Sequence, residues 1–183
     1  MRNYRAAAVA AAVLAALVTA TAPAASGGSR HVRVLDDCDP TTFNATVGPG
    51  TCVGDGRTTF PSFVSQLVAK GSADRWVFKP SSLGTEAGRP LDVQNRGGEF
   101  HTFTEVAQYG GGCIAFLNQL LGLKAVPECL PLVAPNVPLA FVTSGVDPGG
   151  TLDVAGLSPG VHRFECLIHP WMHTTVTVAA DDD

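Results

Sequence analysis

The chain has 183 residues, 45% of them hydrophobic and 15% charged, which fits one globular domain and argues against a disordered chain. With 12 Lys and Arg against 16 Asp and Glu, the acidic balance argues against a nucleic-acid-binding protein. The 20 Gly and 13 Pro residues indicate many short elements joined by turns rather than a bundle of long helices.

The first 25 residues have the pattern of a secretory signal peptide. Arg2 and Arg5 form a positively charged start, and the apolar core that follows, Ala6–Val18, is too short to span a bilayer. Small residues follow this core, and we expect cleavage after Ala24 or Ala25. The protein is therefore predicted to be periplasmic or secreted, with no stable membrane span; an uncleaved helical anchor is the alternative.

Residues 26–75 are predicted to form an N-terminal extension. This region is rich in Gly, Pro and Asp turn signals and contains Cys38 and Cys52. A short strand is indicated at 32–35. The apolar residues of 61–70 recur at helical spacing before Gly71, which predicts a short helix.

Residues 76–183 show a different pattern, of short segments, several of them alternating, separated by Gly, Pro, Asn and Asp. They predict strands at 76–80, 90–95, 99–106, 139–144, 151–156, 161–166 and 174–178. Regular short strands of this kind favour an all-β sandwich or barrel. An insertion at 107–137 interrupts them; its residues 114–121 fit one or two helical turns, and a disulfide would support so long a loop.

Five cysteines in an exported protein leave one thiol without a disulfide partner. Cys38 and Cys52 form one close pair in the sequence, and Cys113 and Cys129 form another. Four cysteines allow three pairings, and the sequence alone does not choose among them. We expect the two local disulfides, Cys38–Cys52 and Cys113–Cys129, which would leave Cys166 free.

The segment 164–173 carries the chemistry. Cys166, His169 and Met172 follow one another at Cys-x2-His-x2-Met spacing. Thiolate, imidazole and thioether are soft or borderline donors that together select copper over hard cations. A blue-copper site needs a second histidine in the same plane. His101, in a strand-like run just after a Gly-Gly pair, is the best candidate.

With these residues the chain resembles the cupredoxins, over roughly 76–179. The short Cys-x2-His-x2-Met loop is similar to that of amicyanin. The resemblance implies an all-β Greek-key sandwich or barrel with short helical insertions and one copper ion per chain. It implies His101, Cys166 and His169 as equatorial metal ligands and Met172 as the axial ligand.

The sequence departs from the cupredoxin pattern in three places. Thr102 stands where several members have Asn. His173 directly follows Met172, so a second imidazole could compete for the axial position. Residues 27–75 lie outside the usual cupredoxin core.

Three of the four predicted ligands also have a simpler interpretation. Cys166 could be a buried free thiol, His101 a histidine on a sheet face, and Met172 a packing residue. His31 and His162 are expected on exposed elements and are not candidate ligands.

The resemblance implies a type-1, or blue, copper protein that carries one electron. It would not be an enzyme, because a closed four-ligand site leaves no position for a substrate. The edge of His169 usually reaches the surface in cupredoxins and is the expected electron port. We expect a monomer with a redox partner protein.

Other classes stay open. The same ligands could serve copper storage, delivery or sensing. A cupredoxin-fold interaction module would instead use residues 27–75 and the insertion for binding. A small copper enzyme would need an open axial position.

Overall fold

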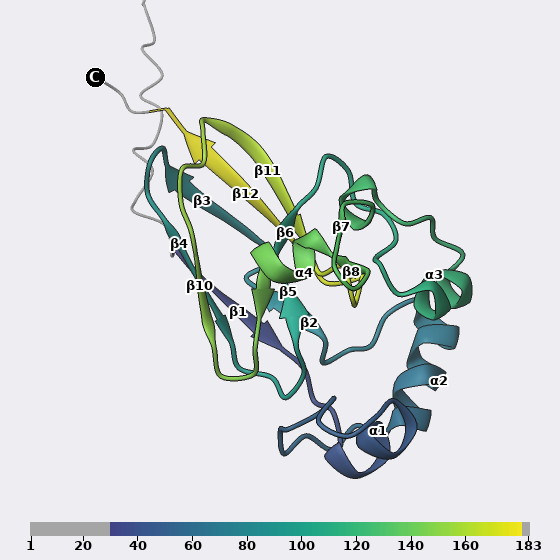
Figure 1. Cartoon of the computed structure of the whole chain (residues 1–183). Helices are drawn as coiled ribbons and strands as arrows, with labels where there is room; N and C mark the ends of the chain where they lie inside the picture. The colour runs from purple at the N-terminus through teal and green to yellow at the C-terminus, as the bar shows by residue number, and fades with distance from the viewer. Residues whose placement is uncertain (1–29, 181–183) are drawn as a thin grey trace, which may run out of the picture.

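The computed structural model describes residues 30–180 (Figure 1). The predicted signal peptide and the last three residues lie outside this range. Within residues 30–180, no helix has the length and hydropathy needed to cross a membrane.

Two four-stranded sheets form the body of the protein. The first has the order β10-β4-β1-β2 and the second the order β3-β12-β11-β6. Burial alternates along β1, β4 and β12, as expected of strands with one face turned to a core. The first sheet comprises β1 (His31–Leu35), β2 (Val77–Lys79), β4 (Leu91–Asn95) and β10 (Thr151–Val154). The second comprises β3 (Ser82–Glu86), β6 (Thr104–Glu105), β11 (Gly160–Glu165) and β12 (His173–Ala179).

Aromatic side chains fill the space between the sheets. The Phe103 ring stacks on Phe164 of β11 at 4.3 Å and meets Phe78 of β2 edge-on at 5.2 Å. All three rings belong to one buried cluster with the inward-facing valines of both sheets. The prediction of an all-β sandwich with short helical insertions is confirmed.

Strand β1 corrects the predicted boundary of the sandwich. Residues 26–75 are predicted to form an extension, yet β1 lies inside the first sheet, parallel to β4 and antiparallel to β2. Val32 and Val34 are fully buried in the core. A five-residue strand carries no signal of its pairing partners, which here lie more than 40 residues further along the chain. The segment outside the two sheets therefore begins after Leu35 and ends before β2.

The segment between β1 and β2 holds two helices, α1 (Pro40–Thr46) and α2 (Phe60–Lys70). Asp39 and Thr59 cap their first turns with side-chain oxygens, and α2 ends at Gly71 in the left-handed conformation. The predicted disulfide Cys38–Cys52 is confirmed. It ties the start of this segment to the loop between the helices.

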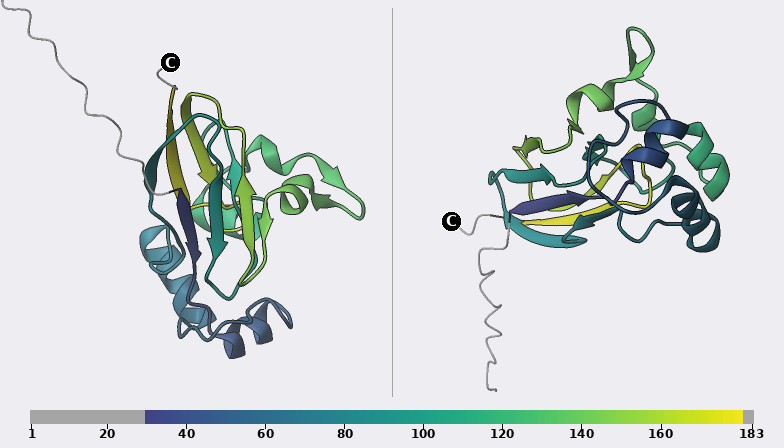
Figure 2. Two further views of the ribbon diagram at one scale, coloured as in Figure 1. Left: turned by 90° about the vertical axis from the view of Figure 1, so that its left-hand side faces the viewer. Right: turned by 90° about the horizontal axis from the view of Figure 1, so that it is seen from below.

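The second large insertion also has its predicted staple, Cys113–Cys129. It contains α3 (Ala115–Leu121), the short 3-10 helix η1 (Pro127–Cys129), and the hairpin of β7 (Leu132–Val133) and β8 (Val137–Pro138), which projects from the body (Figure 2). The helices α1, α2 and α3 lie together at the end of the sheets opposite the C-terminus (Figure 1).

Two predicted strands differ in the structure. Residues 139–144 form a helix, α4 (Leu139–Thr143), rather than a strand. Its apolar run is too short to show a period, and it buries only Ala140. The predicted strand 99–106 is divided into β5 (His101–Thr102), which pairs with β9 (Gly145–Val146), and β6, which pairs with β11. The chain thus changes sheets at Phe103.

His162 should make the stability of the sandwich depend on pH. Its Nδ1 lies 2.7 Å from Glu105 Oε1 and its Nε2 lies 2.7 Å from the Ser158 carbonyl. Burial lowers the pKa of His162, but these two acceptors outweigh it and raise the pKa above its usual value. A raised folded-state pKa adds stability below the unfolded pKa of about 6.5, and that stability is lost as pH rises through the folded pKa.

We therefore expect His162→Gln to lower the free energy of unfolding more at about pH 5.5 than at about pH 8.5. Urea denaturation of both proteins at the two pH values measures the difference. In a Glu105→Gln background, which lacks the facing charge, the effect of His162→Gln should differ less between the two pH values. A pH-independent cost of His162→Gln would contradict the role of the charged ring.

Candidate metal centre

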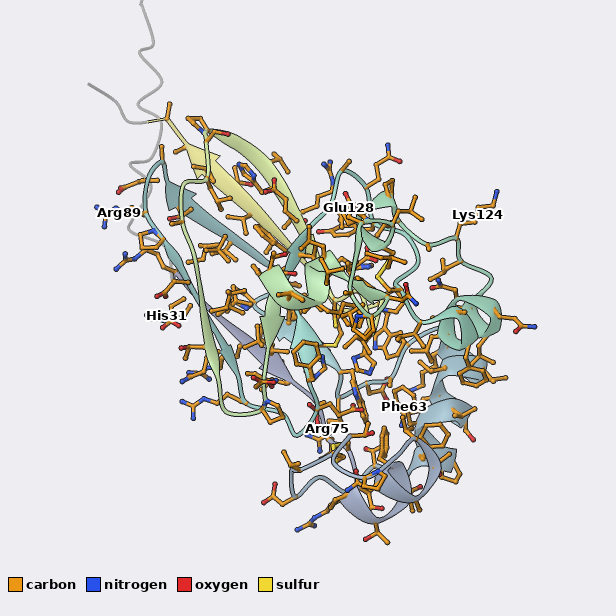
Figure 3. The ribbon with its side chains drawn as sticks, in the orientation of Figure 1. His31, Phe63, Arg75, Arg89, Lys124 and Glu128 are labelled. Carbon is orange, nitrogen blue, oxygen red and sulfur yellow. A yellow bond between two sulfur atoms is a disulfide. The ribbon has the colours of Figure 1, made fainter. Side chains whose placement is uncertain are left out.

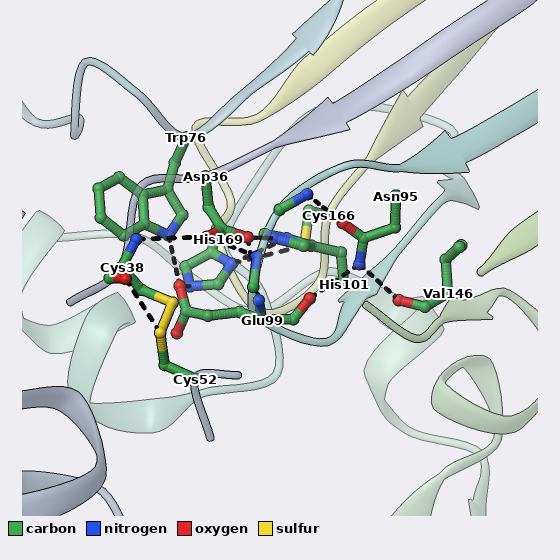
Figure 4. Close-up of polar contacts among 12 residues, drawn as sticks. Asp36, Cys38, Cys52, Trp76, Asn95, Glu99, His101, Val146, Cys166 and His169 are labelled. Atoms are coloured by element: carbon green, nitrogen blue, oxygen red, sulfur yellow. Dashed lines mark hydrogen bonds and ion pairs between the residues drawn. A yellow bond between two sulfur atoms is a disulfide. The ribbon is translucent and has the colours of Figure 1, made fainter. Parts of the chain in front are cut away.

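Three of the four predicted ligands meet at the end of the sandwich that the helices cover (Figure 4). The Nδ1 atoms of His101 and His169 lie 3.2 Å apart, and Cys166 Sγ lies 3.6 Å from the first and 3.8 Å from the second. His101 and Cys166 are fully buried and His169 is 3% exposed. Residues separated by 65 positions thus present their donor atoms to one point.

The strand that carries His101 is locked to the loop that carries Cys166. β5 pairs with β9 through His101 and Val146. Thr102, at the position where the sequence departs from the family, accepts a hydrogen bond from the Leu167 N–H at 2.8 Å. The Asn95 side-chain amide donates to the carbonyls of Glu99 and Val146. Together these bonds hold the approach to His101 in one position.

The ligand loop between β11 and β12 closes on itself. The Cys166 N–H donates to the Met172 carbonyl at 3.1 Å, and the Met172 N–H donates to the His169 carbonyl at 2.9 Å. These bonds bring all three residues of the motif into one tight turn. Met172 is buried within the same core cluster as Cys166.

The outer nitrogen of His101 faces a buried carboxylate. His101 Nε2 lies 2.9 Å from Asp36 Oδ2, and neither side chain is more than 1% exposed. Because an ionised carboxylate only accepts, the ring proton must sit on Nε2. The Nδ1 lone pair of neutral His101 then points toward Cys166 and His169.

The outer nitrogen of His169 also faces a carboxylate. His169 Nε2 lies 3.7 Å from Glu99 Oε2, which accepts a hydrogen bond from the Trp76 indole N–H. Burial raises the pKa of the Glu99 carboxyl, and the neighbouring His169 and Trp76 offset this only in part.

Aromatic rings cover His169. Phe63 of α2, Trp76 and Trp171 lie with their ring centroids 6.2, 6.5 and 5.4 Å from the imidazole. Phe63 points from α2 toward the sheets (Figure 3). The expectation that the edge of His169 reaches the surface is therefore wrong. Helix α2, whose position the sequence did not reveal, lies over His169.

The surroundings of Cys166 favour its thiolate form. Burial raises the pKa of the Cys166 thiol, but hydrogen bonds and charges from His101 and His169 outweigh it and hold that pKa well below its usual range. Burial lowers the pKa of His101, but its hydrogen bonds to Asp36 and Cys166 raise it to about 10. The thiolate form, which binds metal, is thus favoured, and a bound cation would displace the proton on Nδ1.

His173 lies apart from these donors. Its ring stacks on Tyr109 at 4.1 Å, and its Nε2 lies 3.6 Å from Glu165 Oε2 across the β11–β12 pair. It is not a member of the buried His-Cys-His cluster. The structure thus places His173 beside Tyr109 and Glu165, whereas Met172 is buried in the same core cluster as Cys166.

The remaining histidines lie away from the cluster, as expected. His31 is exposed on β1 with Asp92 (Figure 3), and His162 faces Glu105. A second group of potential donors, Asp36, Cys38 and Glu99, lies next to the first. Cys38 is in a disulfide, so this second group offers no thiolate.

The spacing of the three donors fits one metal ion. With bonds of about 2.05 Å to nitrogen and about 2.3 Å to sulfur, a trigonal ion would hold the nitrogens about 3.6 Å apart and each about 3.8 Å from sulfur. The observed separations are 3.2, 3.6 and 3.8 Å. Two imidazoles and one thiolate are also the equatorial donors that suit copper.

Sequence reasoning missed the residues around the ligands. Asp36, Glu99 and Phe63 are brought to the cluster from three different segments and share no spacing with the motif. The one local signal was Asp36 itself, a carboxylate directly after an apolar strand.

Comparisons with known proteins identify similar solved structures. No protein-family model and no curated protein sequence matches the chain. A purple cupredoxin from Nitrosopumilus maritimus is 19% identical, with a TM-score of 0.39, over 58% of this chain and 86% of its own. A mutant fern plastocyanin is 14% identical, with a TM-score of 0.38, over 81% of this chain and 98% of its own.

A third similar structure is a copper-containing nitrite reductase from Thermus scotoductus. It is 14% identical, with a TM-score of 0.33, over 81% of this chain but only 28% of its own.

We expect Phe63→Ala to open the cluster to reagents. Among the described residues, Cys166 is the one cysteine outside a disulfide, and it is buried, so Ellman's reagent should react slowly with the folded metal-free protein. Removing the Phe63 ring uncovers His169 and should speed the reaction roughly tenfold or more, because less local opening is then needed. The absorbance of the released thiolate measures the rate.

Phe60→Ala is the matched control. Phe60 lies on the same helix and packs on Phe43 and Phe63, but it is not among the rings around His169. It should change the rate much less. Equal acceleration by both variants would show that general loosening of α2, rather than the cover over His169, sets the rate.

Proposed function

We propose that the protein is an exported type-1 copper protein that carries one electron at a time. His101, Cys166 and His169 would be the equatorial ligands and Met172 the axial ligand of one copper ion. The observation that carries this proposal is the convergence of two imidazole Nδ1 atoms and one thiol, all buried, within 3.8 Å of one another.

Bound copper would supply a one-electron couple between Cu(I) and Cu(II). The chain's own residues hold the donors in place. Thr102 links the two ligand-bearing segments, and the backbone bonds of the Cys166–Met172 loop fix the other side. A ligand set held this firmly changes little between the two oxidation states, which favours fast electron transfer.

Burial of the ligands favours a carrier over an enzyme. His101, Cys166 and Met172 are each at most 1% exposed, and the rings of Phe63, Trp76 and Trp171 lie beside His169. A substrate would need an open coordination position, and these side chains fill the space around the donors.

Export, a monomeric state and a redox partner protein belong to the same proposal. The signal-peptide pattern supports export. Two disulfides support it as well, because such bonds persist in oxidising compartments.

Copper loading tests the proposal. The mature chain from Ser26, given Cu(II), should develop an intense thiolate-to-copper band and a narrow hyperfine splitting in its EPR spectrum. Cys166→Ser and His101→Ala should abolish the band, whereas His31→Ala, a change at an exposed histidine, should keep it.

Voltammetry then separates carrier from store. Reversible one-electron reduction is expected of a carrier. A folded wild-type protein without the band would overturn the proposal. A protein that binds Cu(I), shows no reversible couple and passes the ion to a chelator would favour copper storage or delivery.

Met172 should set the reduction potential without being needed for colour. We expect Met172→Leu, which keeps the buried volume, to retain the blue band and raise the potential, because the axial donor tunes the couple. His173→Gln should leave the band and the potential unchanged. The opposite pattern, with a response only to His173→Gln, would assign the axial position to His173.

A further inference from the structure

We propose that Asp36 is a positioning residue for the metal centre. Its buried carboxylate keeps a proton on His101 Nε2, directs Nδ1 to the metal, and stabilises Cu(II) over Cu(I). This inference rests on the proposed function and adds the residue that would tune its potential.

Both carboxylate oxygens of Asp36 are engaged by N–H donors. Oδ2 accepts from His101 Nε2 at 2.9 Å and from the Glu99 N–H at 3.0 Å. Oδ1 accepts from the Gly98 N–H at 2.9 Å and from the Cys38 N–H at 3.3 Å. The side chain is 1% exposed. Four donors around a buried carboxyl group favour its ionised form.

The backbone around Asp36 is shaped to let it approach. A Cβ atom at Gly97 would lie 1.8 Å from Asp36 Oδ2, and one at Gly98 would lie 2.5 Å from the Gly54 nitrogen. A side chain at Gly97 would push the segment 97–99 away from the carboxylate, so Gly97 serves the contact that reaches His101 through Asp36. Gly98 instead makes room for the backbone of Gly54.

Strand pairing brings Asp36 to this place. β1 and β4 run parallel, with Val34 opposite Asn95, and the Arg96 N–H donates to the Val34 carbonyl. Both strands therefore end at the same level of the sheet. Asp36 follows one end and the segment 97–101 follows the other, and the Cys38–Cys52 disulfide holds the chain just beyond Asp36.

A neutral acceptor would suffice to orient His101. A carboxylate does more, because it places a full negative charge one imidazole ring away from the metal in a buried region, where charges are poorly screened. Cu(II) carries one more positive charge than Cu(I). A fixed anion therefore favours Cu(II) and lowers the reduction potential. Carboxylates that bind the far nitrogen of a metal-bound histidine also make the ring a stronger donor.

Asp36→Asn tests this role, with Asp37→Asn as the matched control. Asn keeps the size and one acceptor oxygen but removes the charge. Asp37 is the adjacent carboxylate and binds Thr58 instead of His101. In the copper-loaded proteins, we expect Asp36→Asn to keep the blue band and weaken Cu(II) binding relative to Cu(I) at least tenfold. That ratio corresponds to a rise in potential of about 59 mV or more. Asp37→Asn should leave the potential unchanged.

A second readout does not depend on electron transfer. In the wild-type protein loaded with Zn²⁺, which accepts the same donors and is redox-silent, NMR should show a His101 Nε2 proton protected from exchange. Asp36→Asn should speed that exchange, and Asp36→Glu, which restores the charge, should recover part of the protection and of the low potential. Circular dichroism shows whether Asp36→Asn folds. If it does not fold, the proposal is tested by the exchange rate of the His101 Nε2 proton in the wild-type zinc protein and by the reduction potential of Asp36→Glu.

The outcomes separate this inference from the proposed function. A wild-type protein without a blue band rejects the proposed function. If wild type and Asp36→Asn both show the blue band and have equal reduction potentials, only the role of Asp36 is rejected and the proposed function stands. A His101 Nε2 proton in the zinc protein that exchanges freely with water also rejects it.

Discussion

Three donor atoms, two nitrogens and one sulfur, are buried within 3.8 Å of one another in this protein, and the rest of this end of the sandwich depends on that approach. Neutral imidazole nitrogens and a thiolate would present only lone pairs to the space between them. A proton or a metal ion can occupy that space. Either way a positive charge is required at the centre, and the surrounding structure can be understood as support for it.

Hydrogen bonds and two carboxyl groups hold the three donor residues in place. Asp36 and Glu99 face the outer nitrogens of His101 and His169, so a carboxyl group lies behind each imidazole. The two contacts are not equivalent. Asp36 makes a hydrogen bond at 2.9 Å and has both oxygens engaged, whereas Glu99 lies 3.7 Å from its histidine and is tied to Trp76. The His101 side is therefore the more rigid half of the centre.

The segment between β1 and β2 and the loop between β11 and β12 cover this end and change how it can be reached. The helix α2 brings Phe63 over His169, and the ligand loop brings Trp171 beside it. A dry site strengthens every charge interaction within it. The same cover lengthens the path from the metal to the surface, so an electron would leave through aromatic side chains rather than from an exposed imidazole edge.

Features whose parts lie close together in the chain could be predicted from the residues alone. The spacing of Cys166, His169 and Met172 predicted that these residues lie together, and one tight turn brings them together. The two disulfides joined near neighbours, and alternation along the strands indicated the sandwich. Only the tertiary structure decided the features made by distant pairing. Asp36 reaches His101 because β1 and β4 end at the same level, and α2 lies over His169 because its segment folds back across the end of the sheets. The sequence around a five-residue strand or a single aspartate does not indicate which distant residues it will contact. Helix α4 was missed for a related reason, since five apolar residues fit a strand or a helix until their neighbours are known.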